Sequence, residues 1–299
     1  MPELTAQVSD DIELCYESYG DSADPTILLI MGLGGPMGWW SVAFCESLAA
    51  RGFFVVRYDN RDVGRSSRVK SAVRLTRAVV VRTFVGASRD VPYTLSDLAA
   101  DGVGLLDHLG VRRAHVVGVS MGGMIAQTIA IEHADRVLSL TSIMATTGRR
   151  TVGWQHPGLL PMFFRRNDRS REAYVAASHV TAKVLGSPGY PADAEVIRAR
   201  AEETFDRGWE PLGVLRQTLA VISQPDRTSA LRNLRIPACV IHGTADRLVH
   251  PSGGRATAAA IPGAELVLIP GMGHDLPPEL DDVITEAIAR TAARASVQA

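Results

Sequence analysis

The sequence predicts an α/β protein in which a mostly parallel β-sheet is flanked by helices and interrupted by an inserted helical segment. Two observations carry this prediction. Apolar runs of strand length alternate with amphipathic helical stretches along most of the chain, which is the pattern of a parallel sheet covered on both faces. Between residues 147 and 229 this alternation stops, and helical periodicity continues without a convincing strand.

We therefore expect one core made of residues 1–146 and 230–299, with residues 147–229 as a helical cap inserted into it. Helices of the cap are expected near residues 170–186, 192–206 and 211–222. Aromatic residues such as Trp154 and Trp209 occur along this segment. Two interpretations of them are open: they line an acyl or ring pocket, or they form a small core of the cap itself.

Composition and charge exclude several classes of protein. The formal net charge of −1 gives no electrostatic footprint for nucleic acid. No apolar run approaches the roughly 18 residues that a membrane span requires, and the first residues lack the basic and apolar parts of a signal peptide. The three cysteines, Cys15, Cys45 and Cys239, are far apart and fit no metal-ligand spacing, so we expect reduced thiols in a cytoplasmic protein.

The first elements build one side of the predicted sheet. Residues 4–20 are expected to form two short strands, the second alternating in period two like a half-buried edge strand. Residues 26–31 form a continuous apolar run that ends in the glycine turn, Gly32–Gly35. Such a turn is either a plain connection or a loop that brings backbone N–H groups close to a substrate.

The next stretch joins a helix, a strand and a polar turn. A helix is predicted over residues 39–52 and a buried strand over 53–58, which leads into a turn, 59–66, rich in Asp and Arg. We interpret Asp59 and Asp62 as residues that hold this turn through hydrogen bonds, not as catalytic residues.

Residues 68–90 combine apolar residues with six basic residues: Arg68, Lys70, Arg74, Arg77, Arg82 and Arg89. A basic amphipathic helix here would either rest weakly on an anionic membrane or lipid surface or help to cover the active site. We favour a simpler interpretation, which is a surface helix with a solvated basic face.

The chain is organised around the stretch Gly118–Gly123. A buried strand, 114–117, precedes it, and a helix with small residues in its first turn follows it. Gly118, Ser120 and Gly122 fit the pattern G-x-S-x-G, in which a strand turns sharply into a helix and presents a serine hydroxyl. The glycines lack Cβ atoms, so strand and helix can pass closely, and the helix N-terminus directs unpaired N–H groups at the serine.

The remaining core elements continue the alternation. Helices are predicted over residues 95–109, 253–260 and 279–295, and strands over 136–144, 236–243 and 265–269. In a parallel sheet, functional groups gather where the carboxyl ends of the strands meet. Three candidates follow such strand ends: Ser120, Asp246 and His274.

These three residue types can together activate a hydroxyl, because a serine needs a base and the base needs an acid that orients it. Among eight histidines, His274 alone combines a strand end, a glycine approach and a position late in the chain. His242 is the serious rival, and we interpret it as a core residue or as a support for the acid. The stretch after Met144 holds no carboxylate, so Asp246 is the favoured acid, and Asp275 is expected on the surface.

Three segments carry a resemblance to a known family: Arg57–Ser66, His115–Gly122 and Ile269–His274. With the order Ser, Asp, His along the chain, they make the sequence resemble the α/β-hydrolase-fold serine hydrolases over essentially its whole length, and more narrowly the aclacinomycin methylesterase branch. Many relatives have His-Gly where this chain has Met31-Gly32, a difference that leaves the backbone donors in place.

The resemblance implies hydrolysis of a carboxylic ester of a small to medium apolar substrate. It implies Ser120, Asp246 and His274 as catalytic triad and the N–H groups of Leu33 and Met121 as oxyanion hole, with no metal and no organic cofactor. Two alternatives stay open. The same triad serves thioesters, lactones, carbon–carbon bonds and perhydrolysis, and some proteins of this fold bind a ligand with little turnover.

Overall fold

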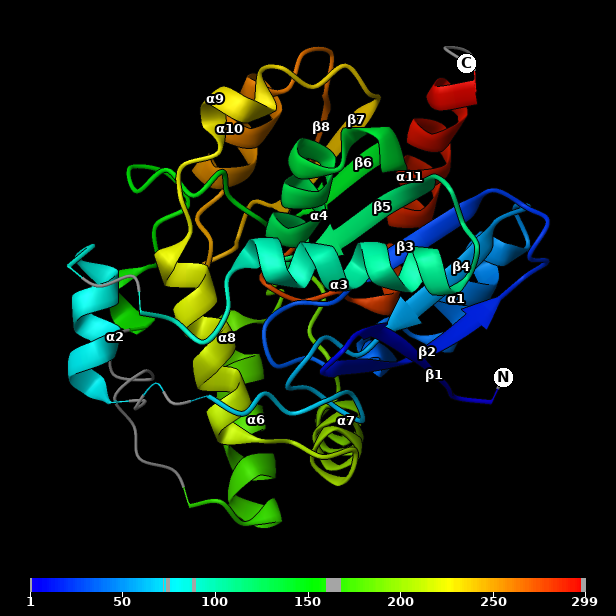
Figure 1. Ribbon diagram of the computed structural model, residues 1–299. Coiled ribbons are helices and arrows are strands. Elements are labelled where there is room, and N and C mark those ends of the chain that lie inside the picture. The colour runs from blue at the N-terminus through cyan, green and yellow to red at the C-terminus, as the bar shows by residue number, and fades with distance from the viewer. Residues whose placement is uncertain (1, 72, 74–75, 88–89, 160–167, 297–299) are drawn as a thin grey trace.

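An eight-stranded sheet forms the centre of the protein (Figure 1). The computed structural model describes residues 2–71, 73, 76–87, 90–159 and 168–296. The strands follow the order β1-β2-β4-β3-β5-β6-β7-β8. They are β1 (Leu4–Ser9), β2 (Ile12–Tyr19), β3 (Thr26–Ile30), β4 (Phe54–Tyr58), β5 (Ala114–Val119), β6 (Val137–Ile143), β7 (Ala238–Gly243) and β8 (Glu265–Ile269). Only β2 runs antiparallel to its neighbours, β1 and β4, and every other pair is parallel.

The parallel strands end along one edge of the sheet. Ile30, the last residue of β3, lies opposite Tyr58 of β4 and Gly118 of β5, and Gly118 lies opposite Ser142 of β6. The turns after these strands therefore open on the same side, as the topology of an open α/β sheet requires. The predicted fold class, a mostly parallel sheet flanked by helices, is confirmed.

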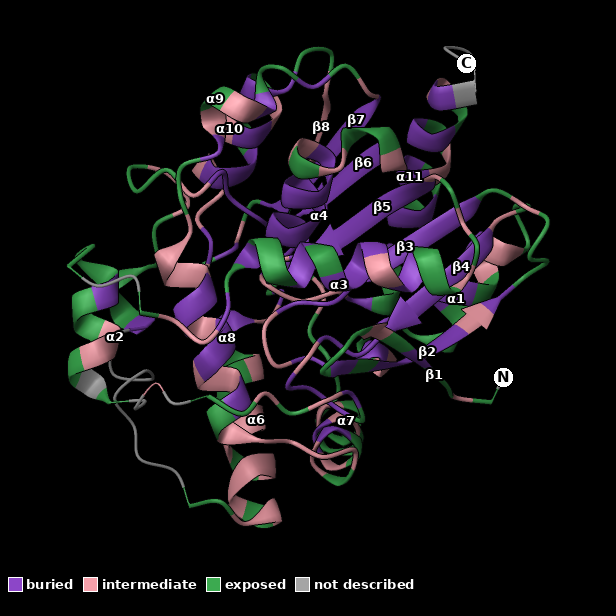
Figure 2. Ribbon diagram, in the orientation of Figure 1, coloured by how far each residue is buried: buried purple, intermediate pink, exposed green. Residues whose placement is uncertain are grey.

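Helices cover both faces of the sheet (Figure 1). One face carries α3 (Leu95–His108), α4 (Met121–Glu132) and α10 (Ser252–Ala260), and the other carries α1 (Val42–Ala49) and α11 (Asp281–Ser296). Along β3, Leu28 and Ile30 pack in the apolar cluster of the first face, and Ile27 and Leu29 in that of the second. Burial on both faces (Figure 2) explains why this strand is apolar at every one of these positions.

Between β6 and β7 the described chain contains helices and no strand. They are η3 (Pro157–Leu159), α6 (Arg171–Leu185), α7 (Ala194–Asp206), α8 (Pro211–Ser223) and α9 (Thr228–Leu231). The three helices expected in the cap, residues 147–229, correspond to α6, α7 and α8. The expected boundary at residue 229 falls inside α9, which packs against α10 and α4 of the core. Other single turns of 3₁₀ helix are η1 (Met37–Trp39), η2 (Ala134–Arg136) and η4 (Pro278–Leu280).

Aromatic side chains form a small cluster inside the cap. The ring of Tyr174 lies 4.6 Å from that of Trp209 and 5.9 Å from that of Phe205, measured between centroids. The interpretation of a separate cap core therefore holds for Trp209. Residues 160–167, which include further apolar residues of the cap, lie outside the described part of the chain.

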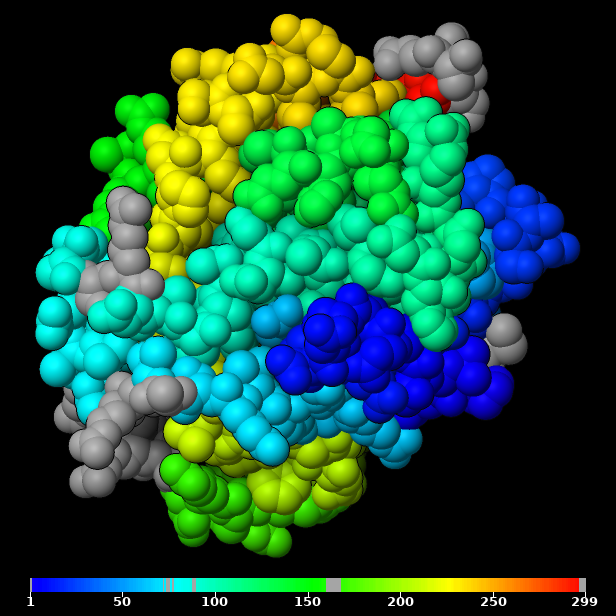
Figure 3. Space-filling model, viewed as in Figure 1, coloured from blue at the N-terminus to red at the C-terminus, as the bar shows by residue number. Residues whose placement is uncertain are grey.

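The basic segment 68–90 contains one short helix, α2 (Arg77–Phe84), which packs against α8. Figure 3 shows α2 in cyan at the edge of the molecule. Arg68 lies before this helix, and its guanidinium donates to the carbonyl oxygens of Gly64 and Gly208. Arg74 and Arg89 lie outside the described residues. None of the described helices is both long enough and apolar enough to span a membrane.

Candidate active site

Ser120 occupies the turn between β5 and α4. Its backbone has a φ of 57° and a ψ of −119°, a conformation that is strained for a residue with a side chain. A Cβ on Gly118 would overlap the carbonyl oxygen of Gly122, and one on Gly122 would overlap that of Ile30. Only glycine fits at these two positions. The predicted strand, sharp turn and helix around the serine are therefore present, and α4 begins directly after it, at Met121.

His274 lies between Ser120 and Asp246. Its Nε2 atom is 2.9 Å from Ser120 Oγ, and its Nδ1 atom is 2.7 Å from Asp246 Oδ2. An ionised carboxylate only accepts hydrogen bonds, so Nδ1 carries the hydrogen and Nε2 is free to accept the serine proton. The structure therefore brings together the three candidates that follow β5, β7 and β8, in an arrangement that can activate a serine hydroxyl.

Asp246 is a buried anion. In addition to the bond from His274, its Oδ1 atom accepts hydrogen bonds from the N–H groups of Leu248 and Val249, each at 2.9 Å. Burial raises the pKa of Asp246, but the charge of His274 and the hydrogen bonds from His242 and His274 outweigh burial and lower the pKa to about 2. This carboxyl is therefore ionised throughout the pH range in which histidines ordinarily titrate.

His242, the rival base, supports Asp246 instead. Its side chain is fully buried, and its Nε2 atom donates to the carbonyl oxygen of Val249 at 2.8 Å and lies 3.3 Å from Asp246 Oδ2. Its Nδ1 atom has no hydrogen-bond partner among the described residues, so the hydrogen is on Nε2. His115 is likewise a core residue, buried in β5.

A hollow of about 300 Å³ opens beside the turn that carries Asp246. Its walls include Trp154, His156, Arg247 and His250. The rings of Trp154 and His250 are stacked, with centroids 4.1 Å apart. Trp154 therefore lines a hollow beside the Asp246 turn, and Ser120 is not among the residues that line it.

The glycine turn lies next to the serine. A Cβ on Gly32 would be 3.2 Å from the Cβ of Ser120. Two N–H groups of this turn are already used: that of Gly34 donates to Gln217 Oε1 at 2.8 Å, and that of Gly35 donates to the Gly32 carbonyl oxygen at 3.2 Å. The turn is therefore more than a plain connection, because its backbone approaches Ser120 closely.

Two further N–H groups near the serine are those of Leu33 and Met121. Among the described residues, neither Leu33 N–H nor Met121 N–H has a hydrogen-bond partner. Met121 is the first residue of α4, where the partial positive charge of the helix N-terminus adds to the N–H dipole. Both groups are available to an oxygen atom that becomes negatively charged beside Ser120.

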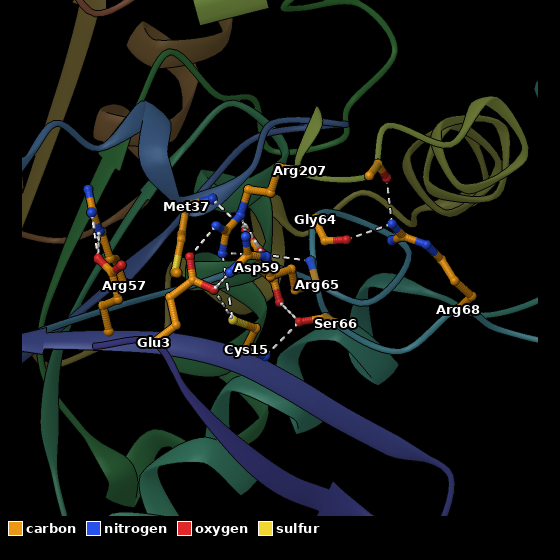
Figure 4. A network of polar contacts seen from close by, with 12 residues as sticks. Glu3, Cys15, Met37, Arg57, Asp59, Gly64, Arg65, Ser66, Arg68 and Arg207 are labelled. Atoms are coloured by element: carbon orange, nitrogen blue, oxygen red, sulfur yellow. Dashed lines mark hydrogen bonds and ion pairs between the residues drawn. The ribbon is translucent and has the colours of Figure 1, made fainter. Parts of the chain in front are cut away.

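Two aspartates of the polar turn after β4 connect the core to the cap. Asp59 accepts a hydrogen bond from the N–H of Met37 at 2.7 Å and pairs with the guanidinium of Arg207 at 2.8 Å (Figure 4). Asp62 pairs with Arg216 of α8 through two bonds of 2.7 and 2.8 Å. Both aspartates therefore form structural hydrogen bonds, as the sequence predicts, but the sequence does not indicate their partners in the cap.

The cap also holds the turn that carries His274. The N–H of His274 donates to the carbonyl oxygen of Leu185 at 2.7 Å. Ser187 Oγ accepts from the N–H of Gly273 at 2.8 Å and donates to the carboxylate of Asp275. Asp275, expected on the surface, is half-buried, and its carboxylate accepts this bond from the segment after α6.

The chain belongs to the α/β-hydrolase fold family, whose model matches residues 25–279. It is 32% identical over 314 residues to the rhodomycin D methylesterase of Streptomyces peucetius, an alignment that covers 97% of this chain and 98% of that enzyme. A thermophilic esterase from Thermogutta terrifontis has a similar structure, with a TM-score of 0.75, 24% identity and 99% of both chains covered. An enol-lactonase from Burkholderia xenovorans has a TM-score of 0.72 at 25% identity, covering 98% of this chain and 100% of that one. The protein is therefore an esterase-type hydrolase of this family.

Proposed function

We propose that the protein hydrolyses carboxylic esters through an acyl-enzyme on Ser120, with His274 as general base and acid and Asp246 as the residue that orients it. The position of His274 carries this proposal. One ring nitrogen lies 2.9 Å from the serine hydroxyl and the other 2.7 Å from the aspartate carboxylate, which is the geometry that acyl transfer requires.

The reaction would proceed in two halves. Ser120 Oγ attacks the ester carbonyl carbon while His274 Nε2 takes its proton. The carbon–oxygen bond to the alcohol then breaks, and the alcohol leaves with the proton from His274. In the second half, water gives a proton to His274 and attacks the acyl-enzyme, which releases the carboxylic acid and restores the serine.

The N–H groups of Leu33 and Met121 would stabilise the negative oxygen of both tetrahedral intermediates. The proposal is supported by their lack of other partners among the described residues and by the approach of Gly32 to Ser120. Loss of one such donor typically costs about 10² to 10³ in kcat.

We propose an apolar acid esterified with a small alcohol as the substrate. Identity of about one third to rhodomycin D methylesterases over nearly the full chain supports a methyl ester. A leaving group as small as methanol offers few contacts, so specificity would depend on the acid side of the ester and on the cap.

The test is the initial rate of hydrolysis of p-nitrophenyl esters of increasing acyl length and of the matching methyl esters. We expect measurable turnover by the wild type and a fall of about 10⁴-fold or more in kcat for Ser120→Ala. Near-normal hydrolysis by Ser120→Ala would contradict the proposal.

The same assay separates the alternatives. Faster turnover of thioesters or lactones than of esters of the same acid would show that the enzyme prefers that bond to an ester. Binding of an ester, measured calorimetrically, without product from any substrate would favour a ligand-binding protein of this fold.

A further inference from the structure

We infer that Gln217, on helix α8 of the cap, is a positioning residue that fixes the glycine turn so that Leu33 N–H points at the reacting oxygen. This inference rests on the proposed function, because it concerns the oxyanion donors of that reaction. It identifies a second role for the cap, which would complete the catalytic site in addition to enclosing the substrate.

Gln217 holds two turns together through hydrogen bonds from its side-chain amide. Its side chain is fully buried and uses both ends of its amide. Oε1 accepts the N–H of Gly34 at 2.8 Å, and Nε2 donates to the carbonyl oxygen of Arg61 at 3.0 Å. The amide therefore joins the glycine turn after β3 to the polar turn after β4. A buried amide satisfied at both ends has one orientation, because a flipped amide would oppose donor to donor and acceptor to acceptor.

The glycine turn is held at three points, and Gln217 provides the middle one. Asn60 Nδ2 donates to the Met31 carbonyl oxygen at 3.0 Å, before the turn, and Met37 N–H donates to Asp59 after it. Both of these bonds come from the core. Between these two points, Gln217 is the residue, among those of the cap that the structure describes, whose side chain bonds to the turn.

Fixing Gly34 constrains its neighbour. The N–H of Gly34 belongs to the peptide unit that joins it to Leu33, and Leu33 N–H belongs to the unit before it. Holding the first unit therefore restricts the torsions of Leu33 through which Leu33 N–H is oriented. Gly34 itself has a φ of +69°, in the region that glycine adopts freely, so its own conformation does not restrain the turn. Beside the bond from Gly35 N–H to the Gly32 carbonyl oxygen within the turn, Gln217 restrains the turn at Gly34.

Helix α8 is itself fixed firmly enough to serve as a support. Arg216, the residue before Gln217, is paired with the buried Asp62. One turn earlier, Val214 packs against the glycine turn, 3.1 Å from where a Cβ of Gly34 would stand. Leucine has a similar volume to glutamine, so packing alone does not require a polar residue at position 217. The amide of Gln217 is needed to satisfy and orient the backbone.

The experiment compares three variants with the wild type. Gln217→Leu keeps the volume and loses both bonds. Gln217→Glu keeps the acceptor for Gly34, and its carboxyl donates to the Arg61 carbonyl oxygen only while protonated. Thr218→Val is the matched control, because among the described residues the Thr218 hydroxyl bonds only to the backbone of its own helix, at Val214. Each variant is assayed for kcat and KM with a p-nitrophenyl ester and for the rate of covalent labelling by a fluorophosphonate.

We expect Gln217→Leu to lower kcat and the labelling rate in parallel, by about 10- to 100-fold, with KM changed less than about threefold. Thr218→Val should retain wild-type values. Gln217→Glu should recover activity relative to the wild type as pH falls, since only the protonated carboxyl reproduces both bonds of the amide. A purely structural role would change thermal stability without this split or this pH profile.

Wild-type kcat and labelling in Gln217→Leu would overturn the inference while the proposed function stands. If Gln217→Leu does not fold, Gln217→Glu decides, and a pH profile parallel to that of the wild type overturns the inference. If the fluorophosphonate labelled the wild type no faster than Ser120→Ala, the proposed function would be overturned, and the inference with it.

Discussion

The strand ends of the core and the cap above them are held in place in different ways. In the core, backbone hydrogen bonds position the site: Ser120 N–H donates to the Ile143 carbonyl oxygen at 2.9 Å, and Ala245 N–H to that of Met272 at 2.9 Å. The cap is joined to the core largely through buried polar side chains, such as Arg216 and Gln217. A substitution in the core site should therefore change chemistry, and one at the cap contacts should change stability or alignment.

The largest expected effect lies in the core, at Asp246. Asp246→Asn replaces an acceptor by an amide that can donate to His274 Nδ1 and so favour the wrong tautomer. We expect kcat to fall by about 10⁴-fold at neutral pH, measured with a p-nitrophenyl ester. Asp275→Asn is the matched control, because this neighbour of His274 bonds to Ser187 and not to the imidazole. Equal losses in the two variants would contradict the assigned role.

The next effect is on stability and concerns the contact between cap and core. Arg216→Met leaves the fully buried carboxylate of Asp62 without its cation, so we expect a loss of about 3 kcal/mol or more in the free energy of unfolding in urea. Arg171→Met makes the same change at an exposed pair with Asp206, within the cap. We expect little change there, because exposed ion pairs contribute little. If Arg171→Met lost as much unfolding free energy as Arg216→Met, the buried pair would not contribute more to stability than the exposed pair.

A smaller effect on stability depends on pH and comes from Asp246. Its pKa is lowered from 3.8 to about 2, so the folded state is favoured when this carboxyl is ionised. The stabilisation, about 2 kcal/mol, is fully present above pH 4 and is lost as pH falls from about 4 to about 2. The difference in unfolding free energy between wild type and Asp246→Asn should therefore narrow over this interval. A difference that stays constant from pH 6 to pH 2 would show that the folded site does not lower this pKa.

Most of the core and the candidate site could be predicted from the sequence, because their signals are local. The apolar run before Ser120, the glycines on either side of it and the helix after it occupy one short stretch, and the structure has the same order. His274 could be chosen among the histidines because strand β8 ends a few residues before it. Parallel strands then bring these separate ends together without further information.

The contacts between cap and core could not be predicted in this way. Gln217 and Gly34 are 183 positions apart, and Arg207 and Asp59 are 148 apart, so no periodicity relates them. A buried glutamine on an amphipathic helix looks like an ordinary polar position until its neighbours are known. The bond of Asp275 to Ser187 could not be predicted for the same reason, since Ser187 belongs to the cap.

The smallest expected effect concerns α2, which we propose contacts an anionic membrane surface weakly. Thr83 on this helix is buried, whereas the apolar side chains of Val81 and Phe84 are 60% and 62% exposed. Arg150 lies over the ring of Phe84, 5.8 Å from its centroid, and Arg82 on the same helix is exposed. Exposed apolar side chains beside cationic ones match the interface of a bilayer with anionic headgroups.

Co-sedimentation with vesicles of phosphatidylglycerol and phosphatidylcholine measures this contact. We expect partial binding of the wild type at low salt and less binding at physiological salt. At the same salt concentration, Arg82→Gln should bind about fivefold more weakly than the wild type, since one surface arginine contributes about 1 kcal/mol. Arg198→Gln removes the same charge from α7, where Arg198 pairs with Glu195 and Glu202, and should leave binding unchanged. Equal binding of wild type and Arg82→Gln would contradict the proposed membrane contact and favour a solvated surface helix.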